Sequence, residues 1–181
     1  GAEPGDILAV TLHALEPMGW GWVSSIPGFG LLAEDYPEPI LKIFTFEEGA
    51  TEARFNARIR VPLRPFPGIM GVAPATDEEL STIPPRENGG NMDNPYLTVG
   101  STTYFPVFVE GALFSIGDPH AVQGKGEVSG TAIEAPLRAV FQLEVIKTEL
   151  PIPEPRYETD EVYAVTAYAT TLDEAVVKAT R

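Results

Sequence analysis

A carboxylate and an imidazole stand two positions apart in this chain, at Asp118 and His120. Side chains alternate between two faces in an extended segment, so these two side chains point to the same side. Such a pair can bind a divalent metal ion, or it can act as a base and its orienting partner. The alternative is a solvated turn with one helpful hydrogen bond, and the spacing alone leaves both interpretations open.

A second polar cluster precedes the first, where Asn91 and Asp93 repeat the same spacing directly after Gly89 and Gly90. Glycine allows the backbone to approach a ligand closely, because it has no Cβ atom. An ordinary Asn-Gly turn would give the same pattern without any ligand. The cluster is therefore a candidate part of a site, with the turn as the alternative.

Two glutamates follow, Glu127 and Glu134, on what the pattern predicts to be one strand. Their separation of seven residues places them on opposite faces of an unbroken strand, and only a bulge near Gly130 would bring them together. Glu134 lies within an apolar run, where burial raises a carboxyl pKa and suits a general acid or base. The alternative is a carboxylate in water at the end of the strand.

Short apolar runs that alternate with polar residues, separated by turns, predict a mainly β protein that positions these clusters. The segments 14–33 and 76–94 are expected to be long loops, and the strand 113–116 is expected to end in a turn at Asp118. A capping-box sequence at Thr171–Glu174 predicts a helix that continues past Arg181. The expected strands are 6–12, 40–46, 55–61, 69–73, 102–109, 113–116, 127–134, 138–146 and 162–169.

The composition excludes several classes of protein. The formal net charge is −14, which argues against nucleic acid or an anionic membrane surface as a partner. The chain has no cysteine, which excludes disulfides, thiolate metal sites and cysteine catalysis. No apolar run approaches the roughly 20 residues that span a bilayer, and the start does not resemble a signal peptide. A cytoplasmic enzyme fits this composition.

Both ends of the sequence look cut, because it opens in a predicted turn before a strand and closes inside a predicted helix. An opening strand with nothing before it leaves an unpaired edge, and an isolated short helix is marginal in water. We therefore expect the chain to depend on missing segments, which a separate chain could supply, or on subunit packing.

Several unrelated short motifs occur together in one order. This chain resembles the acetamidase/formamidase family in the segments Gly1–Asp6, Pro65–Pro74, Asn88–Asp93 and Gly117–Glu127. The resemblance implies hydrolysis of short aliphatic amides to a carboxylate and ammonia, and a tendency to form homo-oligomers. It also implies a jelly-roll-like β-sandwich core, here residues 1–150, followed by the start of a small α/β part at residues 151–181.

The sequence departs from the family pattern in two ways. Members usually have Asp at the position of Lys125. Members also have a segment before the Gly1–Asp6 motif and a helical tail after the motif at 170–175. The isolated chain is therefore expected to be inactive if the missing segment supplies ligands.

Amide hydrolysis without cysteine, and without a serine-lysine nucleophile loop, leaves water activated by a carboxylate, a metal ion or both. We predict that Asp118, His120 and Asp93 hold a divalent metal, zinc or calcium. The proton-transfer candidates are Glu134, Glu127 and His120, and the candidates for binding a small amide are Asn88, Asn91 and Gln123. Two alternatives remain: a non-catalytic β-sandwich binding module, and a metal-dependent hydrolase of another non-peptide C–N bond, such as a cyclic amide.

Overall fold

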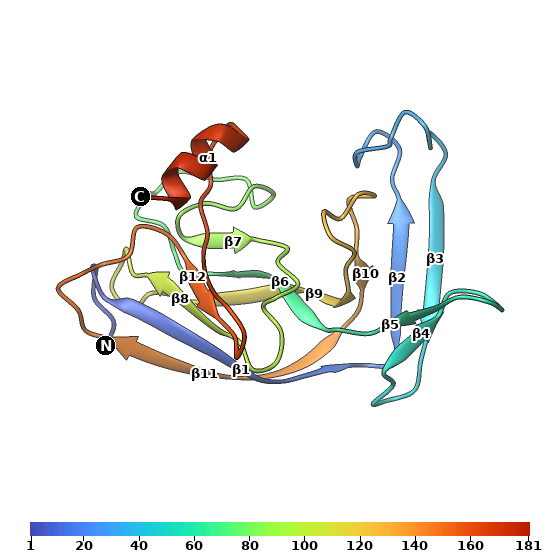
Figure 1. Cartoon of the computed structure of the whole chain (residues 1–181), viewed down its shortest axis with the longest axis horizontal. Coiled ribbons are helices and arrows are strands. Elements are labelled where there is room, and N and C mark those ends of the chain that lie inside the picture. The colour runs from blue at the N-terminus through green and yellow to red at the C-terminus, as the bar shows by residue number, and fades with distance from the viewer.

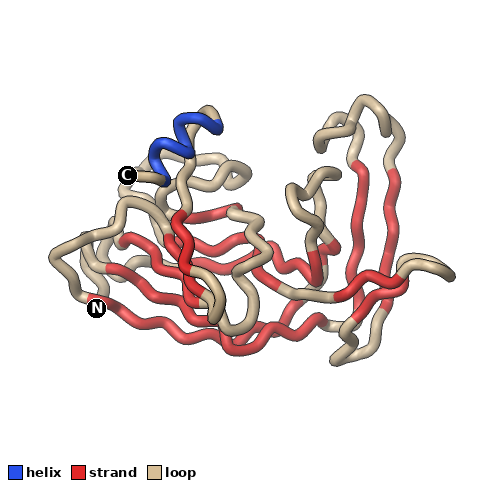
Figure 2. Tube along the Cα trace, viewed as in Figure 1, coloured by secondary structure: helices blue, strands red, loops and turns tan.

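The computed structural model describes all 181 residues as thirteen β-strands and one short helix, shown in Figure 1 and coloured by type in Figure 2. No helix is long and apolar enough to cross a membrane. The elements are β1 (Ile7–Pro17), β2 (Trp20–Ser25), β3 (Ile40–Thr45), β4 (Glu52–Arg54), β5 (Arg60–Pro62), β6 (Phe66–Gly71), β7 (Gly89–Asn91), β8 (Thr102–Pro106), β9 (Ser115–Val122), β10 (Ile133–Glu134), β11 (Leu137–Ile146), β12 (Arg156–Glu158), β13 (Tyr163–Val165) and α1 (Leu172–Ala179).

The strands form two large antiparallel sheets and one small ribbon. The five-stranded sheet has the order β11-β1-β8-β12-β13, and the six-stranded sheet has the order β3-β2-β10-β9-β6-β7. Strands β4 and β5 form a separate two-stranded ribbon. The mainly β fold expected from the sequence is confirmed.

The main hydrophobic core joins the two large sheets. Val10 and Leu12 of β1 and Phe105 of β8 belong to the first sheet, and Met70 of β6 belongs to the second. All four are fully buried, and burial of such a side chain contributes roughly 1.5–3 kcal/mol. The alternation of β1 sends Leu8, Val10 and Leu12 to this face, so the sequence pattern determines which side of the strand is covered. The sheets therefore pack as a sandwich.

A smaller core lies where the β2–β3 hairpin meets the rest of the molecule. It contains Phe44 of β3, Ala53 of β4, Ala121 of β9 and Ile133 of β10. Beyond this contact the hairpin extends away from the sandwich, at the opposite end of the molecule from α1 (Figure 1). The second core thus fixes the base of a projecting arm beside strands β9 and β10.

Several expectations about the strands are wrong, and one is that residues 76–94 form only a loop, because β7 lies within them. Residues 14–33 are not one long loop, because β1 continues to Pro17 and β2 pairs with β3 over its whole length. Residues 55–61 are not one strand, because Asn56 accepts backbone hydrogen bonds that close a turn between β4 and β5. Residues 127–134 form a strand only at Ile133–Glu134, since the backbone turns before it. In the last two cases a local turn interrupts the strand that the sequence suggested.

The chain after residue 150 adds β12 and β13 to the first sheet, with β12 paired to β8. The predicted capping box of α1 is present, with Thr171 and Glu174 each accepting the other's backbone N–H at 3.3 Å. The helix spans Leu172–Ala179 with Thr180 as its C-cap, and its expected continuation past Arg181 stays a prediction. The domain boundary at residue 150 stays a prediction.

Candidate active site

His120 is fully buried at the centre of the second sheet. It lies on β9 opposite Phe66 of β6 and Glu134 of β10, because β9 is paired on both edges. The edge of one aromatic ring faces the other, with 5.0 Å between the ring centres of Phe66 and His120. The register of three strands therefore fixes the imidazole and places one carboxylate beside it.

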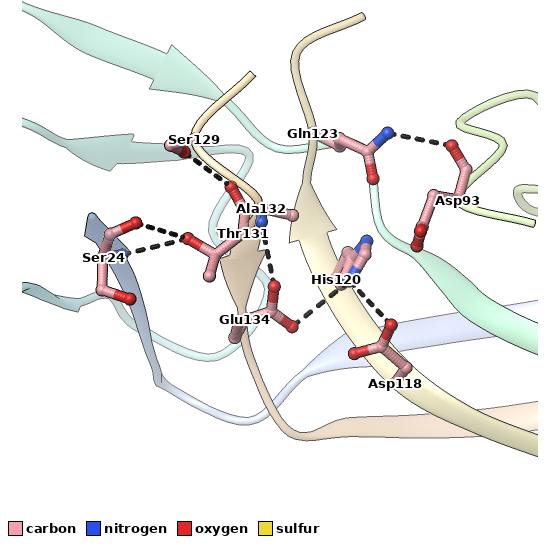
Figure 3. A network of polar contacts seen from close by, with 9 residues as sticks. All are labelled: Ser24, Asp93, Asp118, His120, Gln123, Ser129, Thr131, Ala132 and Glu134. Atoms are coloured by element: carbon pink, nitrogen blue, oxygen red, sulfur yellow. Dashed lines mark hydrogen bonds and ion pairs between the residues drawn. The ribbon is translucent and has the colours of Figure 1, made fainter. Parts of the chain in front are cut away.

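Two carboxylates face the same nitrogen of this ring, as Figure 3 shows. His120 Nε2 lies 3.2 Å from Glu134 Oε2 and 3.4 Å from Asp118 Oδ2. Neither ring nitrogen has a well-aligned hydrogen-bond partner in spite of this closeness. The ring nitrogen and the two carboxylate oxygens are therefore close enough together to hold one ion.

Asp93 and Glu127 complete a cluster of four carboxylates around one histidine. Potential ligand atoms of Asp93, Asp118 and His120 lie within 4.8 Å of one another, and so do those of His120, Glu127 and Glu134. Asp93 Oδ1 is buried and has no hydrogen-bond partner. All five side chains were predicted as site residues, and the structure brings them together.

The backbone under three of these carboxylates is strained. Asp93, Asp118 and Glu127 have φ values of 44°, 49° and 44°, and only two other non-glycine residues in the chain have positive φ. Such conformations are costly for residues with a Cβ atom and cluster at functional sites. The expected turn at Asp118 is therefore wrong: Asp118 lies inside β9, and its unusual backbone conformation aims the carboxylate.

A loop, and not a strand bulge, unites the two glutamates. Glu127 lies in a turn where its N–H bonds the carbonyl of Gly124 and its carbonyl accepts from Gly130. The returning chain is tied to β2 by Thr131, whose hydroxyl donates to the carbonyl of Ser24 and accepts from its N–H, both at 3.0 Å (Figure 3). The seven-residue separation thus gives two converging carboxylates, because the intervening segment folds back.

Glu134 is held in place by its own loop. The N–H of Ala132 donates to Glu134 Oε1 at 2.9 Å, which leaves Oε2 directed at His120 (Figure 3). On the other side of the site, Gln123 donates from Nε2 to the backbone carbonyl of Asp93 at 2.9 Å. Its Oε1 is buried and has no partner. Gln123 therefore borders the cluster through the contact of its amide nitrogen with Asp93, and its predicted role in binding an amide stays a prediction.

Asn88 and Asn91 are not brought into the cluster. Asn88 donates from Nδ2 to the carbonyl of Val72 at 2.8 Å, and Asn91 donates from Nδ2 to the carbonyl of Ile83 at 3.1 Å. These contacts connect β7 and its preceding loop to neighbouring chain segments. Their predicted role in binding an amide stays a prediction.

Gly68 is a part of the site that was not predicted from the sequence. A Cβ atom at this position would lie 2.7 Å from Asp118 Oδ2, 2.8 Å from Asp93 Oδ1 and 2.8 Å from His120 Cε1. Gly68 also accepts the N–H of Asp93 at 3.1 Å. A glycine inside a strand often marks such a close approach, and that signal was present in the sequence.

The buried charges shift one another's pKa values. Burial alone lowers the pKa of His120, but Asp118 and Glu134 together outweigh it and raise that pKa to about 10. Contact with His120 lowers the pKa of Asp118 in spite of its partial burial. Burial raises the pKa of Asp93 to about 6 and that of Glu127 to about 7. The cluster therefore has an excess of negative charge that a cation would stabilise.

The donor set fits a divalent metal ion. It offers one imidazole nitrogen and carboxylate oxygens from several elements, with Asp93 Oδ1 and His120 Nε2 buried and unsatisfied. Carboxylate oxygens suit hard cations, and imidazole is a common zinc ligand. The candidate ligands are those predicted from the sequence, Asp118, His120 and Asp93.

A family model described as the acetamidase/formamidase family matches residues 1–80 and 75–173. These matches cover more than half of the sequence. The chain belongs to the acetamidase/formamidase family. The resemblance found in the motifs is thereby confirmed.

Individual relatives and solved structures agree with this assignment. A protein of Schizosaccharomyces pombe assigned as a formamidase is 32% identical over 216 residues, covering 87% of this chain and 53% of that protein. The crystal structure of a predicted acetamidase/formamidase from Thermoanaerobacter tengcongensis superposes with a TM-score of 0.92 at 36% identity, covering 99% of this chain and 58% of that one. A gamma lactamase from Delftia acidovorans superposes with a TM-score of 0.78 at 26% identity, covering 90% and 54%. The chain therefore spans a little over half the length of these relatives.

Proposed function

We propose that this chain contains the active site of an amidase that hydrolyses short linear amides, such as formamide and acetamide, to a carboxylate and ammonia. The observation that supports it most is the convergence of four carboxylates from separate segments on the buried His120. Such an arrangement costs stability, because like charges are held together on a strained backbone. Family membership makes amide hydrolysis the reaction that best accounts for that cost.

Asp118, His120 and Asp93 would hold a divalent metal, and the imidazole favours zinc over calcium. When bound, the metal supplies a Lewis acid and lowers the pKa of a coordinated water molecule. The chain's own contribution is to orient the ligands. Gly68 gives them room, and Gln123 fixes the backbone of Asp93.

Glu134 and Glu127 are the proposed proton carriers. Both have a carboxylate oxygen within 4.8 Å of His120, and Glu134 is oriented by the N–H of Ala132. In the reaction, the oxygen of water bonds to the amide carbon, the C–N bond breaks, and the leaving nitrogen takes a proton. A carboxylate that accepts the proton of water can return it to that nitrogen.

The test compares the two histidines of the chain in the full-length protein. His120→Ala is expected to lower ammonia release from formamide, acetamide and propionamide by at least about 100-fold, the scale of positioned acid–base catalysis. The control is His13→Ala, because His13 is exposed and its ring makes one side-chain hydrogen bond, to Gln142 at 3.3 Å. Retention of activity within a few fold by a folded His120→Ala protein would show that the site is wrongly assigned.

A second candidate function is hydrolysis of a cyclic amide, favoured by the likeness to the gamma lactamase. A substrate panel that adds a five-membered lactam separates the two candidates, because the preferred substrate has the higher kcat/KM. Absence of both metal and ammonia release from a folded protein with intact ligands would instead favour a binding module.

A further inference from the structure

A large cavity lies directly beside the candidate active site. Its volume is about 860 Å³, and it is lined by the β2–β3 hairpin, the β4–β5 ribbon and residues of the segment 122–133. Glu127 and Gln123 belong both to its wall and to the active site. Pockets of roughly 300–1,000 Å³ hold drug-sized ligands, whereas acetamide has only a methyl group beside its amide. A short amide therefore leaves most of this space unused.

The walls of the cavity are mainly apolar and aromatic. Phe44 and Phe55 form part of one side, with 6.2 Å between their ring centres, and Phe29 and Tyr36 come from the long loop of the hairpin. Aromatic rings of a ligand pack well between such side chains. The shape and chemistry of the walls therefore suit a planar or branched apolar group.

The charge of the cavity is opposite to that of the protein. The chain has 12 lysines and arginines against 26 acidic residues, yet three of the cations and only one acid line this space. The cations are Lys42, Arg64 and Lys125, and the acid is Glu127. An anion would meet repulsion over much of this protein, so a local excess of positive charge marks a preferred place for one.

None of the three cations is paired with a carboxylate. Lys42 lies over the ring of Phe44, with its Nζ 5.7 Å from the ring centre. Arg64 and Lys125 both lie over the ring of Tyr96, each 5.7 Å from its centre, and Lys125 also donates to the Tyr96 hydroxyl at 3.3 Å. Contacts with ring faces hold a cation in place without neutralising its charge.

We propose that this cavity binds the acyl part of the substrate, and that the substrate class is primary amides whose apolar, aromatic acyl group ends in a carboxylate. The inference rests on the proposed function for the amide end. The amide lies at the His120 cluster, the ring occupies the space beside Phe44 and Phe55, and the distal carboxylate meets Arg64 and Lys125. Hydrolysis adds water across the C–N bond, giving a dicarboxylate and ammonia.

The kinetic test uses the full-length protein and compares three primary amides as substrates. They are 4-(carbamoylmethyl)benzoate, its neutral analogue 2-(4-methylphenyl)acetamide, and acetamide. The expected order of kcat/KM places the anionic arylacetamide first and acetamide last. Each buried methylene is worth roughly a fourfold preference, and a charge-assisted contact is worth roughly tenfold or more. A higher kcat/KM for acetamide than for both aryl amides would overturn the proposal.

Two variants test whether Arg64 and Lys125 contact the carboxylate of the substrate. Arg64→Met and Lys125→Met are each expected to reduce the preference for the anionic over the neutral aryl amide by about tenfold. The matched control is Arg58→Met, because Arg58 is exposed in the β4–β5 turn and does not line the cavity. An unchanged preference in both folded variants would refute the carboxylate contact, and the comparison of the three amides by the unmodified protein tests the proposal even if a variant fails to fold.

A binding measurement separates this inference from the proposed function. Calorimetry with 4-methylbenzoate and its neutral analogue 4-methylbenzyl alcohol requires no hydrolysis. Binding of the anion that Arg64→Met weakens about tenfold would support the cavity assignment even if no amide is hydrolysed. Equal binding of the anion and the alcohol, or no binding of either, would overturn it whatever the protein does to amides.

Discussion

Replacing Gly68 by alanine is the smallest change that should disable the proposed site while leaving the fold intact. The added methyl group would point at three groups at once, Asp118 Oδ2, Asp93 Oδ1 and His120 Cε1. The two oxygens are the ends of side chains, which can rotate away at little cost to stability. They are also the atoms proposed to bind the metal, so their displacement should affect function far more than folding.

The size of the effect follows from the distances. Ordinary contacts of a Cβ atom begin at 3.4 Å, whereas the three neighbours would lie at 2.7–2.8 Å. They must therefore retreat by about 0.6–0.7 Å, roughly three times the ±0.2 Å within which metal–ligand distances are held. Misplacement of that order costs about 100-fold in rate, so we expect kcat/KM for acetamide to fall about 100-fold in Gly68→Ala, together with the bound metal content.

The assay measures ammonia release, metal content and thermal melting for Gly68→Ala and a matched control. The control is Gly117→Ala, because Gly117 lies on β9 next to Asp118 and a Cβ atom there would meet nothing within 4 Å. The control should resemble the unmodified protein in all three measurements. Metal content and kcat/KM of Gly68→Ala within twofold of this control would refute the proposed geometry.

Replacing Thr131 by Val removes both hydrogen bonds to Ser24, and we expect the free energy of unfolding in urea to fall by roughly 1–3 kcal/mol; an unchanged midpoint would show that the loop is held by other contacts. The hydrogen bond from Lys147 and the N–H of Glu3 lower the pKa of Asp6 from 3.8, so its contribution to stability is present above pH 3.8 and is lost as the pH falls through the lowered pKa. Asp6→Asn should therefore melt below the unmodified protein at pH 7 and approach it at acid pH, and a difference that does not change with pH would count against this linkage. Removal of divalent metal with a chelator is expected to lower amide hydrolysis at least about 100-fold, with recovery on addition of zinc; full activity of a protein verified as metal-free would exclude the metal role.

The strand pattern was predictable wherever a strand has one buried face. The alternation of Leu8, Val10 and Leu12 and the capping box at Thr171 are local signals, and both appear in the structure as expected. Strand β3 was expected at 40–46, but its partner β2 was missed, because most residues of β2 are half-buried and no clean alternation marks them. Side-chain alternation thus identified single strands, whereas the pairing of β2 with β3 was not visible in it.

Single residues of the site were also visible in the sequence, because residue type defines chemistry. Asp118, His120 and Asp93 were recognisable as potential ligands from spacing alone. The convergence of Glu127 with Glu134 was not visible in the sequence, because it depends on a loop that folds back through Gly130. The two-residue alternation of side chains applies within a strand, and it gives no information about where side chains point once the backbone turns.

The sequence by itself determined the mainly β fold, the family and the residue types available for chemistry. Only the tertiary structure decided which of them meet: strand register placed Glu134 opposite His120, and a close approach made Gly68 part of the site. It also left Asn88 and Asn91 bonded elsewhere. The physical reason is that a site is a set of distances between segments far apart in the chain, and long-range strand pairing sets those distances.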